Sequence, residues 1–112
     1  MTLSNGSAET AAALLERGGV GHLFEQHLSV ADAGRWKPAP EPYRLAAERC
    51  GVGREDMTLV AVHPWDVDGA RRAGLTGAWL NRRGSEWPAF LDPPDVVAPD
   101  LPALAAALLR TV

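Results

Sequence analysis

The sequence predicts an α/β fold, with a parallel sheet and helices on both of its faces. Two observations predict this fold. Short apolar runs typical of buried strands alternate along the chain with segments whose apolar residues recur at helical spacing. Glycine, proline and small polar residues separate these segments, and no linker, repeat or low-complexity stretch interrupts them. Residues 1–112 are therefore expected to form a single domain built on one parallel sheet.

Five strands are expected, at residues 1–4, 27–30, 57–62, 77–81 and 95–98. The run 57–62 is the clearest of them. Because it is almost wholly apolar, we expect both of its faces to be covered by other elements. The run 1–4 is expected to be the end of a strand, because Asn5-Gly6-Ser7 is typical of a loop.

Four helices are expected, one following Ser7, one beginning at Pro42, one at residues 67–73 and one following Asp100. Ser7 and Asp100 have side chains that can cap a helix N terminus. The prolines at positions 38 and 40 forbid a helix before Pro42, which itself suits a first helical turn. The last helix has an apolar stripe that we interpret as core packing, formed by Leu101, Leu104, Ala105, Leu108 and Leu109.

The composition excludes several kinds of partner. The net charge is −3 and no basic cluster stands out, which argues against nucleic acid binding. No apolar run approaches the ~20 residues that a membrane span needs, and the first residues lack the features of a secretory signal. Cys50 is the single cysteine, which fits a reducing compartment. We expect a cytoplasmic protein with neither a membrane nor a nucleic acid as partner.

Three loops that each follow an expected strand contain polar side chains suited to one pocket. They contribute the hydroxyl and amide of Ser4 and Asn5, the amine of Lys37, and the imidazole and carboxylate of His63 and Asp66. Such loops are where open α/β sheets place their chemistry. Each residue also has a simpler explanation, because Ser4 and Asn5 can form a turn, Lys37 can be solvated, and Asp66 can cap a helix.

Taken together, the spacing of these loops resembles that of the haloacid dehalogenase superfamily, in its type II, L-2-haloacid dehalogenase-like branch. The resemblance covers nearly the whole chain. The matching runs are Leu3-Ser4-Asn5-Gly6, Leu28-Ser29-Val30, Trp36-Lys37-Pro38, Tyr43, Val60 through Ala70, and Ala73-Gly74. The Trp-Asp-x-x-Gly-Ala run with its upstream His-Pro is specific for the branch, and the Lys-Pro-x-Pro run is moderately specific for the superfamily.

The resemblance implies a Rossmann-like core with a cap and an aspartate nucleophile on the first strand. That aspartate displaces halide from a small 2-haloacid, and water then hydrolyses the aspartyl ester. Lys37 matches the lysine that holds the nucleophile ionised, and Asp66 matches the carboxylate that pairs with this lysine. Ser4, Asn5 and Tyr43 match substrate-binding positions. No metal or other cofactor is implied.

The chain departs from this pattern because the Asp-x-x-x-Thr nucleophile strand and the cap are missing from it. It is expected to correspond to the C-terminal half of a family member. The missing strand would lie between the strand ending at Ser4 and the strand ending at Val62, so we expect exposed apolar edges on both. The predicted consequences are self-association, or completion by an N-terminal segment.

His63 is a second departure, since studied dehalogenases carry asparagine there and serine at the position of Ala61. The imidazole could act as a general base in the water step, or it could be structural. Two other functions stay open. One is a phosphatase of the same superfamily, which would need several carboxylates around Mg²⁺. The other is a non-catalytic or truncated module that needs a partner segment.

Overall fold

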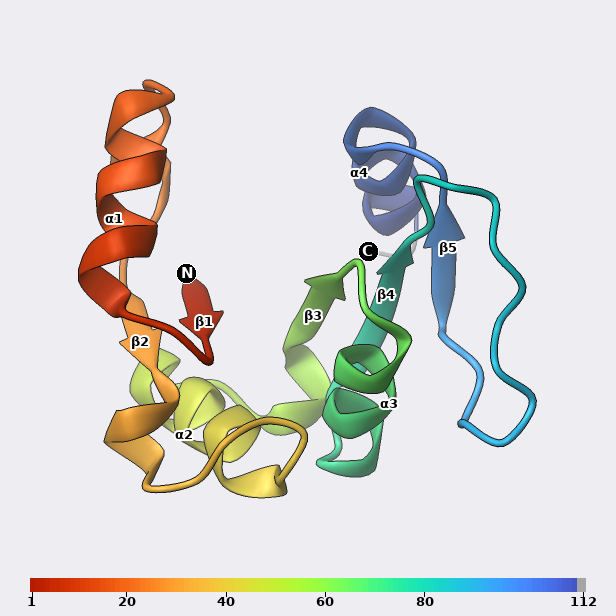
Figure 1. Cartoon of the computed structure of the whole chain (residues 1–112), viewed down its shortest axis with the longest axis horizontal. Coiled ribbons are helices and arrows are strands. Elements are labelled where there is room, and N and C mark those ends of the chain that lie inside the picture. The colour runs from red at the N-terminus through yellow and green to blue at the C-terminus, as the bar shows by residue number, and fades with distance from the viewer. Residues whose placement is uncertain (111–112) are drawn as a thin grey trace.

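The computed structural model describes residues 1–110 and confirms an α/β arrangement of parallel strands with helices on both sides (Figure 1). The strands are β1 (Thr2–Ser4), β2 (His27–Ser29), β3 (Thr58–Ala61), β4 (Thr76–Leu80) and β5 (Val96–Ala98). The helices are α1 (Ala8–Arg17), α2 (Pro40–Cys50), α3 (Pro64–Arg72) and α4 (Leu101–Arg110). Short 3-10 turns are η1 (Gly21–Leu23), η2 (Val30–Ala33) and η3 (Arg54–Asp56).

The strands form two parallel sheets, and the gap between them lies where the sequence predicts that a strand is missing. One sheet has the order β1-β2 and the other has the order β3-β4-β5. In Figure 1, α1 stands beside the first sheet, α3 and α4 flank the second, and α2 lies at the base between them. Within residues 1–110, β1 and β3 therefore each have one strand neighbour, and their other edges face each other without pairing.

A cleft of about 720 Å³ lies between the facing edges of β1 and β3. Its walls include Leu3 from β1 and every residue of β3. Val60 and Val62 are 42% and 47% exposed, so the prediction that apolar groups are exposed at this edge is confirmed. The prediction that both faces of this strand are covered is wrong. Strand side chains alternate between faces, and only the face of Leu59 and Ala61 is partly covered.

Two helices begin earlier than the sequence predicts, and proline is the reason in both cases. α2 begins at Pro40 rather than Pro42, and α3 begins at Pro64 rather than Val67. The first N–H groups of a helix have no partner inside the helix, so prolines in the first turn cost no hydrogen bond. The expectation that Pro40 forbids a helix is therefore wrong, and Asp66 lies in the first turn of α3 rather than in a loop before it.

The apolar stripe of α4 is core only in part. Leu104 is buried against Ala78 of β4 and Ala98 of β5. Leu101 and Leu109 are exposed, so the interpretation of the whole stripe as core packing is wrong. The physical reason is that α4 packs on β5 and β4, which leaves part of its apolar surface beyond the sheet, with Leu101 lining the cleft.

The second core cluster joins the two halves of the molecule. Tyr43 of α2 packs with Ala70, Ala73 and Leu75 around α3, and Leu3 of β1 packs against them. The small side chains of α3 let α2 approach closely. α2 therefore fixes how the loop before it and the start of α3 lie relative to each other, and these two segments contain the predicted site residues.

No helix among residues 1–110 is long and apolar enough to cross a lipid bilayer.

Candidate active site

Lys37 lies in the loop before α2, and hydrogen bonds hold both its backbone and its side chain. Its backbone N–H donates to Asn5 Oδ1 at 3.0 Å, just beyond the end of β1. Its ammonium Nζ donates to the Leu3 carbonyl at 3.0 Å and to Asp66 Oδ2 at 2.8 Å. The Lys37 and Asp66 side chains are each only 8% exposed. The ion pair is thus desolvated, and attraction between its charges is stronger than at the surface.

The ammonium of Lys37 can donate one further hydrogen bond to a ligand. An ammonium group has three N–H donors, and the Leu3 carbonyl and the Asp66 carboxylate take two of them. Lys37 and Asp66 both line the cleft between β1 and β3. The arrangement can therefore bind a second carboxylate that enters the cleft, with the positive charge holding that carboxylate ionised.

Tyr43 fixes the other oxygen of the same aspartate. Its hydroxyl donates to Asp66 Oδ1 at 2.6 Å and lies 3.1 Å from the Asp66 carbonyl oxygen. The side chain is fully buried. Burial, together with the hydrogen bond to Asp66, raises the pKa of the Tyr43 hydroxyl far above its ordinary value. The phenol thus stays a protonated donor over the whole neutral range.

The first turn of α3 presents Asp66 to Lys37. His63 is the N-cap residue and Pro64 the first helical residue, so Asp66 lies where the helix dipole favours a carboxylate. Gly69, one turn further on, allows α3 to approach α2. A Cβ on Gly69 would lie 2.6 Å from Pro38 Cβ and 2.8 Å from the Tyr43 hydroxyl. Any side chain there would push apart the two segments that form the site.

His63 lies at the mouth of the site without joining the ion pair. Its ring stacks on Trp65, with centroids 5.6 Å apart and planes 12° apart. It lines the same cleft as Lys37 and Asp66. Within residues 1–110, the imidazole makes no hydrogen bond to another group, and it does not cap α3. Both ring nitrogens are therefore available to a ligand or a water molecule.

The structure brings together most, but not all, of the residues predicted from the sequence. Lys37, Asp66, Tyr43 and Asn5 form one connected hydrogen-bonded group. Ser4 lies apart from it, because its hydroxyl accepts the backbone N–H of Gly6 at 2.9 Å in a local turn.

Two contributors were missed in the sequence. The Leu3 carbonyl is a backbone atom, which no residue type can signal. Gly69 stands inside the matching run, but only the packing reveals why a glycine is needed there.

Among residues 1–110, no group of three or more His, Cys, Asp or Glu side chains is arranged to hold a metal ion. Asp68, the other buried acid of α3, is already occupied. Its Oδ1 accepts the Asp92 backbone N–H at 3.0 Å, and its Oδ2 pairs with Arg72 at 3.1 Å. It therefore anchors the loop before β5 and does not turn toward Asp66.

Comparison with known proteins identifies the family. The model of the haloacid dehalogenase-like hydrolases matches residues 1–74, which include Ser4, Lys37 and Asp66. The chain belongs to the haloacid dehalogenase-like hydrolase family.

Three relatives illustrate the match. The chain is 38% identical over 102 residues to haloacetate dehalogenase H-2 of Moraxella sp. (strain B), covering 91% of this chain and 46% of that protein. It is 33% identical to (S)-2-haloacid dehalogenase 2 of Pseudomonas sp. (strain CBS-3), covering 91% and 44%. The structure of 2-haloacid dehalogenase from Pseudomonas syringae pv. Tomato DC3000 superposes with a TM-score of 0.83 at 32% identity, covering 98% and 46%. The chain thus spans about half the length of these relatives.

Proposed function

We propose that this chain forms half of the active site of a hydrolase that removes halide from small 2-haloacids. The observation that carries the proposal is the desolvated Lys37–Asp66 pair, with a remaining N–H donor of Lys37 available at the cleft. Relatives that match most of the chain are dehalogenases of haloacetate and of (S)-2-haloacids. The nucleophilic carboxylate comes from a polypeptide segment that occupies the cleft between β1 and β3.

The reaction balances with that carboxylate as the nucleophile. Its oxygen attacks the carbon that bears the halogen, the carbon–halogen bond breaks, and halide leaves with the bonding electrons, which yields an ester. Water then attacks the ester carbonyl, which releases the 2-hydroxy acid, restores the carboxylate and frees one proton. In this scheme Lys37 holds the nucleophile charged, Asp66 holds Lys37, and Tyr43 and Asn5 position that pair. Ser4 and Asn5 are the proposed substrate contacts at the end of β1.

The test is complementation in trans. The chain is mixed with the N-terminal half of a related dehalogenase, and halide release from a panel of 2-haloacids is followed. We expect release from the mixture and little from either half alone. Replacing Lys37 by alanine should lower the rate of the mixture about 10²-fold, because a charge aimed at the reacting group is lost. Equal halide release by the chain alone would contradict the proposal that the nucleophile comes from elsewhere.

A phosphatase reaction is the alternative within the same family. It would need additional carboxylates near Asp66 to hold Mg²⁺. The engagement of Asp68 with Asp92 and Arg72 supports the metal-free reaction instead. Phosphate release from a phosphomonoester by the same mixture, abolished by EDTA, would favour the phosphatase. Failure of both assays would favour a non-catalytic module.

His63 is proposed as the base that activates water in the second step. Its free imidazole at the cleft supports this role, since a general base needs an unoccupied nitrogen within reach of water. We expect His63→Asn in the complemented pair to slow hydrolysis of the ester intermediate while leaving its formation unchanged. An unchanged rate of ester hydrolysis would leave His63 with a structural role. His22→Asn, the matched substitution at an exposed histidine that does not line the cleft, is the control.

We also place the protein in the cytoplasm. The single cysteine, Cys50, supports a reducing compartment, and its thiol lies 3.0 Å from the Met1 sulfur rather than in a disulfide. Cell fractionation with an antibody against the chain tests this location, and recovery in a secreted fraction would contradict it.

A further inference from the structure

Trp79 connects the central strand of the larger sheet to the site. It lies in β4, and its side chain is buried. Its indole Nε1–H donates to the carbonyl oxygen of Val62 at 2.9 Å. An indole has one polar group, a donor, and a buried donor without a partner costs free energy. The bond therefore restricts both the tryptophan and the backbone that accepts it.

The acceptor of this bond, the Val62 carbonyl, lies at the start of the turn between β3 and α3. The register between β3 and β4 ends with Ala61 opposite Trp79, and Val62 lies one residue beyond it. The indole thus extends the connection between the strands by one residue, using a side chain in place of a backbone bond. The next residue is His63, which is the N-cap of α3 and whose side chain makes no capping hydrogen bond.

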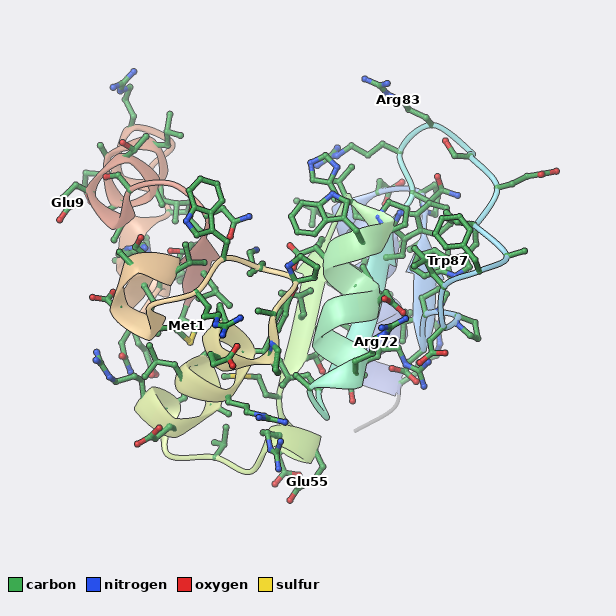
Figure 2. All side chains as sticks on the ribbon, turned by 60° about the horizontal axis from the view of Figure 1, so that its bottom comes forward. Met1, Glu9, Glu55, Arg72, Arg83 and Trp87 are labelled. Carbon is green, nitrogen blue, oxygen red and sulfur yellow. The ribbon has the colours of Figure 1, made fainter. Side chains whose placement is uncertain are left out.

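A second tryptophan supports the first from outside. Trp87 lies in the loop between β4 and β5, and its ring projects toward the sheet (Figure 2). It meets Trp79 edge to face, with ring centroids 5.0 Å apart at 69°. Its own N–H donates to the Leu91 carbonyl within the loop. Trp87 therefore packs against Trp79, and within residues 1–110 no hydrogen bond joins it to the turn that contains His63.

We propose that Trp79 is a positioning residue, whose indole N–H fixes the turn between β3 and α3 and thereby holds the His63 imidazole stacked on Trp65 over the cleft. The inference rests on the proposed function only in counting His63 as part of the site. This role differs from packing, because it assigns the position of the His63 ring to the indole N–H of Trp79 and not to the bulk of the indole.

The test observes the His63 ring directly by NMR. Stacking on Trp65 shifts the His63 ring protons upfield, and His22 serves as an internal reference, since it has no such partner among the described ring contacts. The signal is assigned through its disappearance in His63→Asn. Trp79 is then replaced by its benzothiophene analogue, in which sulfur takes the place of the N–H and the ring shape is kept. Trp79→Phe is the second variant, and Trp87→Phe is the control.

We expect loss of the upfield shift of His63 in both Trp79 variants, and retention of the shift in Trp87→Phe. An unchanged His63 shift in the benzothiophene analogue would overturn the proposal, as would the same loss in Trp87→Phe. The measurement needs no substrate or complementing segment. Failure of halide release would therefore refute the proposed function while leaving this inference standing or falling on the His63 signal alone.

Discussion

Asp66 is bound through both carboxylate oxygens, one by the ammonium of Lys37 and one by the hydroxyl of Tyr43. With both oxygens bound and the side chain buried, the Asp66 carboxylate is held in one orientation. At this scale, the contact with Asp66 orients the Lys37 ammonium beside the cleft. The stability of the chain should therefore depend strongly on each member of the group.

Replacing Lys37 by methionine should destabilise the chain by about 3 kcal/mol, because it leaves the buried Asp66 carboxylate without its cation. Urea unfolding measures the difference. Arg83→Met is the control, since Arg83 is exposed and forms no ion pair within residues 1–110, so its removal should cost less than about 1 kcal/mol. Equal costs for the two substitutions would contradict the desolvated ion pair.

Tyr43 should make stability decline in alkaline solution. Its pKa is raised in the folded chain, so its contribution is complete below the unfolded pKa of about 10 and is lost as pH rises above that value. We expect the free energy of unfolding to fall by up to about 1.4 kcal/mol per pH unit there. Tyr43→Phe should reduce this slope. Tyr43 is the single tyrosine, so tyrosinate absorbance should rise only with unfolding.

At the scale of the elements, the close approach of α2 and α3 decides whether the site forms. The cluster around Tyr43 and Ala70 has almost no space between these helices. Pro40 and Pro42 lie in the first turn of α2, so the helix that packs on α3 begins only three residues after Lys37. Lys37 and Asp66 therefore meet because of helix packing and not because of their separation in the sequence.

Gly69→Ala should destabilise the chain by about 1–3 kcal/mol, because the added Cβ would overlap Pro38 and the Tyr43 hydroxyl. The same substitution should weaken the Lys37–Asp66 pair, which a double-mutant cycle with Lys37→Met would reveal as a non-additive free energy. Gly6→Ala is the control, because its Cβ would meet only the Ser4 hydroxyl, at 3.4 Å. Additive energies would show that Gly69 does not act on the pair.

At the scale of the whole molecule, two half-sheets face each other across a cleft that neither fills. Within residues 1–110, β1 and β3 have unpaired edges there, and apolar side chains are exposed at Val60 of β3 and at Val62 just beyond it. Unprotected edges of this kind bind another strand. The same surface thus explains two predicted properties, the acceptance of a complementing segment and, in its absence, self-association.

Val60→Lys should reduce self-association of the isolated chain, because a charge on the β3 edge opposes pairing with another strand. Sedimentation velocity over a range of concentrations measures it. Val52→Lys is a matched control, since Val52 and Val60 are both 42% exposed, yet Val52 lies after α2 and away from the cleft. If the two substitutions had equal effects, the β3 edge would not be the associating surface. Val60→Lys should also weaken complementation.

The pattern of short apolar runs and helical repeats was enough to predict the α/β class, because these periodicities are local properties of the chain. The motifs around Lys37 and Asp66 were enough to predict the family. Helix starts were less predictable, since Pro40 and Pro64 read as helix breakers but lie in first turns. The apolar run around Val60 predicted a strand covered on both faces, yet Val60 is exposed, because burial depends on which elements pack against the strand.

The sequence alone determined which polar groups the chain can bring to a site, namely the amine of Lys37, the carboxylate of Asp66 and the phenol of Tyr43. Tertiary structure decided that Tyr43 is buried against Asp66, that the Leu3 carbonyl holds the Lys37 ammonium, and that Ser4 is engaged in its own turn. The reason is physical. Residue type specifies which hydrogen bonds a group can make, whereas the partner it finds depends on how helices and strands distant in the chain pack together.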